Sequence, residues 1–158
     1  MKITEAKIRA AVKRCMKHLM KKQYELNLPK SAPENALRRL KVYTRTDGRS
    51  WAGHNLLKIN TKCWQFGTKK WSEYNRVAKT PVIGNIQVVD DEDILMCLVA
   101  HEVSHFVQFT YRNWFPEYLK KKQDKDRGHG ECFQTIYRYL RADLVNPMIE
   151  SKKMENVA

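Results

Sequence analysis

The chain has 158 residues, of which 42% are hydrophobic and 30% charged, and it carries a formal net charge of +13 at pH 7. This length is suited to one domain with a buried core, and the hydrophobic content excludes an intrinsically disordered protein. Lys or Arg interrupts every apolar stretch before residue 80 and the N-terminus lacks an apolar h-region, so we expect a cytoplasmic protein without a membrane span or secretory signal.

The first predicted element is an amphipathic helix from about Glu5 to Glu25. Its apolar residues follow the 3.6-residue helical period, and basic residues cover the opposite face. The apolar positions are Ile8, Val12, Cys15 and Leu19. Thr4 precedes the helix and is a favoured N-cap residue, whereas Pro29 and Pro33 follow it and predict its end.

The central part of the sequence predicts a small sheet. Residues 39–45 (RLKVYTR) and 54–60 (HNLLKIN) have the composition of β-strands, and an Asp-Gly turn signal lies between them. This order predicts an antiparallel pair. Residues 82–89 (VIGNIQVV) are a third, short strand in the prediction.

Two helices are predicted in the second half of the chain. The first runs from Asp90 or Asp91 to about Phe109, with acidic residues at its N-terminus, where the helix dipole favours them. Its expected buried residues are Ile94, Leu95, Leu98, Val99 and Val103. After a charged loop over 120–130, the last helix spans about Glu131 to Leu144 and ends at Pro147. These elements predict one α+β domain over residues 1–147 and a flexible tail over 148–158.

The helix over residues 90–109 contains the sequence HEVSH at 101–105. Residues four apart lie on one face of an α-helix, so His101 and His105 are placed to bind one metal ion together. Glu102 projects about 100° away around the helix axis, beside the metal instead of on it. Zinc lowers the pKa of a bound water to about 7, and Glu102 is placed to accept its proton and pass it to a leaving amine.

A core helix that carries two histidines is the alternative interpretation. A Glu102 carboxylate buried in this apolar run without a partner would be strongly destabilising, and a metal with its water removes that cost. The metzincin pattern is excluded because positions 108 and 111 are Gln and Tyr. The candidates for a third ligand are Glu117, His129 and Glu131. His129 lies between two glycines, and Glu131 would complete a thermolysin-like set of two histidines and one glutamate.

The four cysteines do not form a zinc-binding pattern. They lie far apart and include no C-x-x-C pair, which excludes a zinc ribbon and predicts free, mostly buried thiols.

The sequence HEVSH (101–105) followed by HGECF (129–133) resembles the SprT-like zinc metalloproteases, the group that includes Spartan. The resemblance implies that His101, His105 and His129 bind one zinc ion and that Glu102 is the catalytic base. It also implies a minigluzincin-like fold with an N-terminal helix, a small antiparallel sheet, an active-site helix and a C-terminal helix. Characterised members cleave proteins that are bound or crosslinked to DNA. The sequence has no C-terminal cysteine zinc ribbon like that of longer members, so we expect DNA contacts from the protease domain itself.

The positive charge is concentrated in the first third of the chain. Residues 1–50 contain 14 Lys or Arg against 4 Asp or Glu. Such a region attracts nucleic acid through phosphate contacts and counterion release, although a basic surface can also serve only solubility. The candidate contacts are Lys13, Arg14, Lys17, Lys21, Lys22, Arg38, Arg39 and Lys41. Trp51, Trp64 and Trp71 lie between basic residues and are candidates for stacking on unpaired bases, with core packing as the alternative.

The sequence therefore predicts a monomeric zinc endopeptidase that acts on proteins near single-stranded or damaged DNA. A nucleic-acid-binding module with a structural zinc ion and a zinc hydrolase with another substrate are the alternatives. We expect the substrate to extend along an exposed edge of the strand at 54–60. Tyr111 and His54 are candidate stabilisers of the oxyanion, and His18 is expected on the surface.

Overall fold

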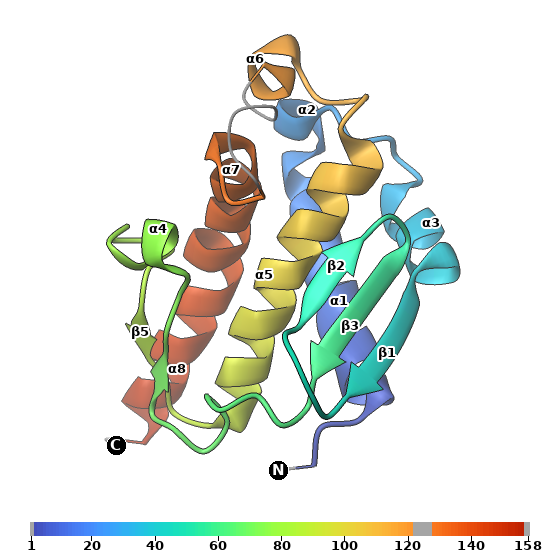
Figure 1. The fold of residues 1–158 in the computed structure, drawn as a ribbon. Helices are drawn as coiled ribbons and strands as arrows, with labels where there is room; N and C mark the ends of the chain where they lie inside the picture. Colours follow the sequence, from blue (N-terminus) through green and yellow to red (C-terminus); the bar gives the residue numbers. More distant parts are fainter. Residues whose placement is uncertain (1, 122–127, 157–158) are drawn as a thin grey trace.

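The computed structural model describes residues 2–121 and 128–156 (Figure 1). Residues 122–127 of the predicted charged loop and the last two residues of the predicted tail lie outside the described residues. The helices are α1 (Glu5–Leu19), α2 (Gln23–Leu26), α3 (Ala32–Arg39), α4 (Asn75–Ala78), α5 (Asp91–Tyr111), α6 (Glu117–Lys120), α7 (Glu131–Leu140) and α8 (Asn146–Glu155). The strands are β1 (Lys41–Arg45), β2 (Trp51–Gly53), β3 (Leu56–Asn60), β4 (Lys70–Trp71) and β5 (Ile86–Gln87). The predicted α+β class is confirmed.

Helix α5 is the central element of the fold. Helix α1 packs behind it, α7 lies along one side, and the sheet of β1, β2 and β3 lies on the other side (Figure 1). Asp90 caps α5 through a capping box with Asp93, as the acidic cluster predicted. All five residues of its predicted buried side are buried. Most of the other residues in α5 are buried too, as expected for a helix that is apolar around most of its circumference.

The three-stranded sheet has the order β1-β3-β2, and its pairing differs from the prediction. Strand β3 pairs with β1 in parallel and with β2 in antiparallel orientation. The predicted antiparallel pairing of 39–45 with 54–60 is therefore wrong. The short strand β2, which was not predicted, forms a hairpin with β3. Strand β1 therefore pairs with the other edge of β3, and it runs antiparallel to β2. The predicted strand at 82–89 is reduced to β5, which pairs with β4.

The N-terminal helix agrees with the prediction in its start and its buried face. Thr4 caps it by accepting a hydrogen bond from the Lys7 amide. It ends earlier than predicted, at Leu19, and a 3-10 turn and α2 follow. The prediction that His18 lies on the surface is wrong, because His18 is buried, with 9% of its surface exposed. Helix α3 was not predicted; Pro33 lies in its first turn, where a missing amide donor costs little.

The chain stays helical past Pro147, where the prediction placed a helix end. A π-helical turn, Arg141–Val145, joins α7 to α8, and Pro147 occupies the first turn of α8. Proline lies just after the π-turn, where the amide of Asn146 already bonds five residues back to the carbonyl of Arg141, so the regular helical hydrogen-bond register is interrupted at this point. Ile149 is fully buried, so this part of the predicted tail packs on the core.

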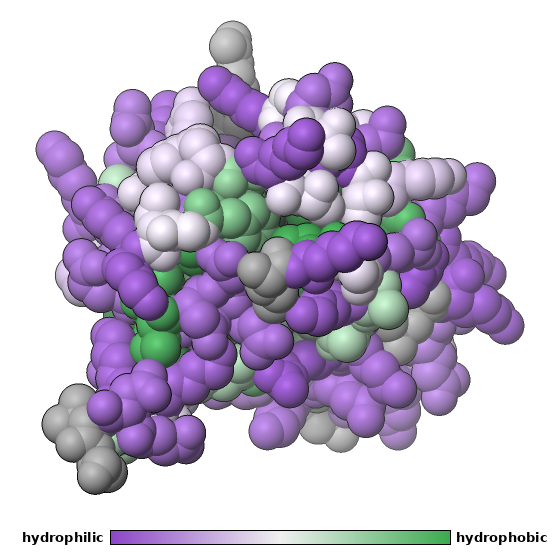
Figure 2. Space-filling model, turned by 90° about the horizontal axis from the view of Figure 1, so that it is seen from below, coloured by the Kyte–Doolittle hydropathy of each residue, from purple (hydrophilic) through white to green (hydrophobic). Residues whose placement is uncertain are grey.

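The surface seen from the lower end of the molecule is mainly hydrophilic, with hydrophobic residues in small patches between polar ones (Figure 2). None of the helices in the described part of the chain has the length and apolar character needed to cross a membrane. All four cysteines are free thiols, and three of them are buried, as predicted.

Candidate metal centre

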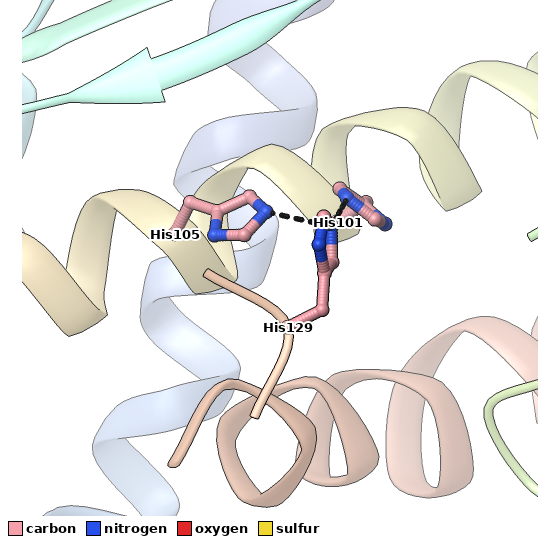
Figure 3. Close-up of side chains that lie close together, drawn as sticks. All are labelled: His101, His105 and His129. Carbon is pink, nitrogen blue, oxygen red and sulfur yellow. Dashed lines mark hydrogen bonds between the residues drawn. The ribbon is translucent and has the colours of Figure 1, made fainter. Parts of the chain in front are cut away.

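The three predicted histidine ligands meet at one point. His101 and His105 lie one turn apart on α5, and His129 lies just before α7 (Figure 3). The Nε2 atom of His129 is 3.0 Å from that of His101 and 3.1 Å from that of His105. Gly128 has a φ of +94°, a backbone angle that side chains disfavour, and this turn directs His129 towards α5.

The arrangement fits a zinc ion by its donor set and its spacing. One ligand atom from each histidine lies within 4.8 Å of the other two, and this group could hold a metal ion. Zinc–nitrogen bonds of about 2.0–2.1 Å in a tetrahedral site separate two ligand nitrogens by about 3.3 Å, close to the spacing of the histidines here. Three protein ligands leave a fourth position for water or substrate, the pattern of a catalytic zinc site.

A buried carboxylate, Glu73, orients the first of these histidines. Its Oε2 atom lies 3.2 Å from Nδ1 of His101. A carboxylate on Nδ1 favours the tautomer that carries a hydrogen there and leaves Nε2 free for a metal. No local sequence pattern marks Glu73, because it lies 28 residues before His101 in an irregular segment and only the fold brings the two together.

Glu73 is itself held by a buried polar cluster. Its Oε1 atom accepts hydrogen bonds from Trp71 Nε1, Tyr137 Oη and Arg141 Nη1, the last at 3.0 Å. Burial alone would raise the pKa of Glu73, but the hydrogen bonds and the charge of His101 outweigh it and lower the pKa. The guanidinium of Arg141 is 1% exposed and also donates to the carbonyl of Gly84. Glu73 thus stays ionised and fixed.

The predicted base, Glu102, is buried beside the histidines. Its Oε2 atom has no hydrogen-bond partner among the described residues. Burial raises the pKa of Glu102 to about 7, with opposing influence from His101 and a smaller rise from Glu73. A carboxylate with a free oxygen and a pKa near neutrality is suited to exchange a proton with a small molecule in the cleft.

The other two histidines are neutral in this environment. Burial lowers the pKa of His105 to about 2 and that of His129 to about 4, and the nearby His101 lowers both as well. Burial also lowers the pKa of His101, but the hydrogen bond and charge of Glu73 outweigh it and raise the pKa overall. Neutral imidazoles at His105 and His129 keep a lone pair for a metal at physiological pH.

A cleft leads to the histidines between the sheet and the segment around Tyr74. Its sheet side includes Arg49, Trp51 and Ala52, on or next to β2. Strand β2 is an edge of the sheet, whereas β3 is paired on both sides. The expectation that substrate pairs with the strand at 54–60 is therefore wrong, and β2 provides the edge beside the site.

Tyr74 is a second residue of the site that no local sequence pattern marks. Its ring stacks on that of His129 with centroids 4.6 Å apart, at an interplanar angle of 16°. Tyr111, a predicted oxyanion stabiliser, donates its hydroxyl hydrogen to the carbonyl of Ala32, so it is committed elsewhere. His54 lies at the turn between β2 and β3 and does not line the cleft at the histidines.

The other candidate ligands lie outside the cluster. Glu117 is on α6 and pairs with Lys120 at 2.9 Å. Glu131 lies in the first turn of α7 with an exposed side chain. Of the three alternatives for the third ligand, His129 is the one that joins His101 and His105.

The predicted nucleic-acid residues fall into two separate groups. Lys13, Arg14, Lys17, Lys21 and Lys22 lie on α1 and the turn after it, behind α5 in Figure 1, whereas the histidines point away from α1 in Figure 3. Arg38, Arg39 and Lys41 line a groove beside the sheet. Three tryptophans were candidates for stacking on bases. Trp71 is buried, which excludes this role, whereas Trp51 and Trp64 are 40% and 72% exposed.

No protein-family model matches the chain, and no curated protein or solved structure is significantly similar to it. The assignment of a function therefore depends on the geometry of the site.

Proposed function

We propose that the protein is a zinc-dependent endopeptidase of the SprT-like type, with His101, His105 and His129 as zinc ligands and Glu102 as the general base. The observation that carries the proposal is the buried Glu102 carboxylate beside three converging histidine nitrogens. A purely structural zinc site has no use for this carboxylate, which is costly to bury without a partner.

Each residue has a distinct role in the proposed reaction. A zinc ion held by His101, His105 and His129 would lower the pKa of a water to near neutrality and would act as a Lewis acid for the substrate carbonyl. Glu102 accepts the proton of the attacking water on its free oxygen and transfers it to the leaving amine. Glu73 holds His101 in one tautomer, and Tyr74 holds the ring of His129 in place.

The position of β2 supports an extended peptide as the substrate. A peptide that pairs with the free edge of β2 passes along the cleft lined by Ala52, Glu102 and His129. Backbone hydrogen bonds to an edge strand bind a peptide with little regard for its side chains. The basic residues near the sheet favour a substrate that is associated with DNA.

The test compares the wild type with Glu102→Gln and with a matched control, Glu92→Gln, an exposed residue of the same helix. Zinc content is measured by mass spectrometry, and cleavage of a DNA-binding protein is followed with and without single-stranded DNA. We expect about one zinc per chain in all three proteins and fragments from the wild type and the control alone.

Other outcomes lead to the alternative functions. Zinc in all three proteins without fragments under any condition would indicate a binding module with structural zinc. Cleavage of a labelled oligonucleotide that depends on Glu102 would indicate a hydrolase with a nucleic-acid substrate. Absence of zinc from every preparation would mean that the segment over 101–105 belongs to a core helix.

A further inference from the structure

The outward face of the three-stranded sheet has a row of residues with no role in the proposed peptide cleavage. The strand register places Tyr43 of β1 opposite Lys58 of β3, and Lys58 opposite Trp51 of β2. Side chains on a strand alternate between its two faces. The adjacent residues that mark the inner, buried face are Val42, Ala52 and Leu57. The row of Tyr43, Lys58 and Trp51, which we call the platform, therefore lies on the outer face.

The aromatic rings of the platform are accessible. Tyr43 is 48% exposed and Trp51 is 40% exposed, and the Lys58 ammonium lies 5.2 Å from the centroid of the Trp51 ring. Adjacent strands are about 4.8 Å apart, so the platform extends about 10 Å across the sheet. Gly53 allows the tryptophan ring to lie along the sheet, because a Cβ at this position would be 3.2 Å from Cζ3 of Trp51.

Positive charge lies beside the β1 end of the platform. Lys41 lies two residues before Tyr43 on the same face of β1, and Arg38 and Arg39 at the end of α3 line the same groove. Within the described parts of the chain, these three residues and Lys58 form no ion pair with an acidic side chain. Arg45, the next residue on this face of β1, pairs with Asp47 at 3.2 Å. The groove thus combines the accessible ring of Tyr43 with uncompensated cations, and Trp51 continues the platform towards the cleft at the histidines.

We infer that this sheet face binds a single-stranded polynucleotide, with bases stacked on Tyr43 and Trp51 and phosphates contacting Lys41, Lys58 and the end of α3. Stacking on aromatic side chains requires unpaired bases and tolerates any base sequence, whereas the cations follow the backbone. An acidic polypeptide would satisfy the cations but has few flat rings for the two aromatic residues.

The platform and the candidate metal centre are adjacent. Trp51 belongs to the platform and also lines the cleft that contains His105 and His129. A strand bound on the platform therefore places a protein attached to it next to the cleft. This delivery role rests on the proposed peptidase function, whereas binding of the strand does not, and the two are measured separately.

Binding is tested by fluorescence anisotropy with labelled oligothymidylate, oligouridylate and a DNA duplex, on the Glu102→Gln protein to prevent cleavage. We expect the single strands to bind more tightly than the duplex. Substitution of both Tyr43 and Trp51 by alanine removes two stacking surfaces and is expected to weaken single-strand binding at least about tenfold. Melting curves show whether each variant is folded, and exposed side chains of this kind are expected to leave the melting temperature nearly unchanged.

The charge contribution is tested with two matched double variants. Lys41→Ala with Lys58→Ala removes two charges from the platform groove, and Lys13→Ala with Lys17→Ala removes two exposed charges from α1. We expect the first pair to reduce the slope of log affinity against log salt by about 1.4, near 0.7 per phosphate contact, and the second pair to change it little.

Three results would overturn the inference. Equal losses of affinity from the two charge variants would show that binding follows net charge and not the platform. Unchanged affinity in the Tyr43 and Trp51 variant would exclude stacking. Equally tight binding of heparin and oligothymidylate, both insensitive to the aromatic substitutions, would indicate a general polyanion surface. Cleavage of a substrate free of nucleic acid reports on the peptidase site independently of all three.

Discussion

The carboxylate of Glu73 and the imidazole of His101 form a buried pair in which Oε2 lies 3.2 Å from Nδ1. The pair links the candidate metal centre to the interior, because the second oxygen of Glu73 accepts hydrogen bonds from Trp71, Tyr137 and Arg141. The position of the first histidine is thus determined by residues from two other segments of the chain, 71–73 and 137–141. Such partners of metal ligands commonly contribute strongly to metal affinity.

Replacement of Glu73 by glutamine is expected to weaken zinc binding by about 10- to 100-fold, because a neutral amide holds the His101 tautomer less firmly. The variant also leaves the buried Arg141 without its counter-ion, which is expected to cost about 3–5 kcal/mol of folding free energy. Zinc affinity is measured by competition with a chelator and stability by urea unfolding. Glu117→Gln on the exposed helix α6 is the matched control. Unchanged zinc affinity in a folded Glu73→Gln protein would contradict the orienting role.

Two substitutions of Tyr74 separate its ring from its hydroxyl. Tyr74→Phe keeps the stack on His129, so we expect zinc affinity and cleavage close to those of the wild type. Tyr74→Ala removes the stack and is expected to lower both. Zinc titration and the rate of peptide cleavage are measured for each variant. Equal loss of cleavage in the two variants, with zinc affinity kept, would instead assign the hydroxyl a direct role in the reaction.

Gly128→Ala is expected to lower zinc affinity, because alanine is strained at a φ of +94° and the turn that directs His129 would shift. Gly67→Ala is the control, since Gly67 has a φ of +83° and lies away from the histidines. Both variants are expected to lose about 1 kcal/mol or more of stability through backbone strain. Zinc affinity should decrease in the first variant alone. An equal decrease in both would mean that general destabilisation is the cause.

The pH dependence of stability in the metal-free protein reports on Glu102. Burial raises its folded-state pKa to about 7, above the unfolded value of 4.5. The folded state therefore binds more protons than the unfolded state between these pH values, and the free energy of unfolding falls as pH rises through this window. A shift of about 2.5 units corresponds to about 3 kcal/mol.

Glu102→Gln removes this titration. The metal-free variant is therefore expected to be more stable than the metal-free wild type at pH 8, and the difference should shrink as pH falls from about 7 to 4.5. Urea unfolding of both proteins between pH 4 and pH 8 measures the difference in their free energies of unfolding. His105 and His129 are present in both proteins, so their titration largely cancels in this difference. A difference that is independent of pH would contradict a raised pKa for Glu102.

Local sequence patterns were sufficient for the parts of the site that lie on one helix. The spacing of His101 and His105 follows from the helical period, and the acidic cluster at 90–93 marks the start of α5. His129 required more than spacing, since Glu117 and Glu131 satisfied the same donor chemistry. The resemblance to a family selected His129, and the fold brings it to the other two histidines.

The tertiary structure decided the features that depend on contacts between distant segments. Hydrophobic periodicity predicts where strands lie in the sequence but not which strands pair with each other. The parallel alignment of β1 with β3 and the free edge of β2 are therefore known only from the fold. Glu73, Tyr74 and Arg141 have no local pattern that marks them, because their roles arise from partners tens of residues away. The sequence by itself determined the class of fold, the central helix and the pairing of His101 with His105 as candidate metal ligands, which depend on residue type and helical spacing. The orientation of the ligands, the edge beside the cleft and the aromatic platform depend on long-range packing.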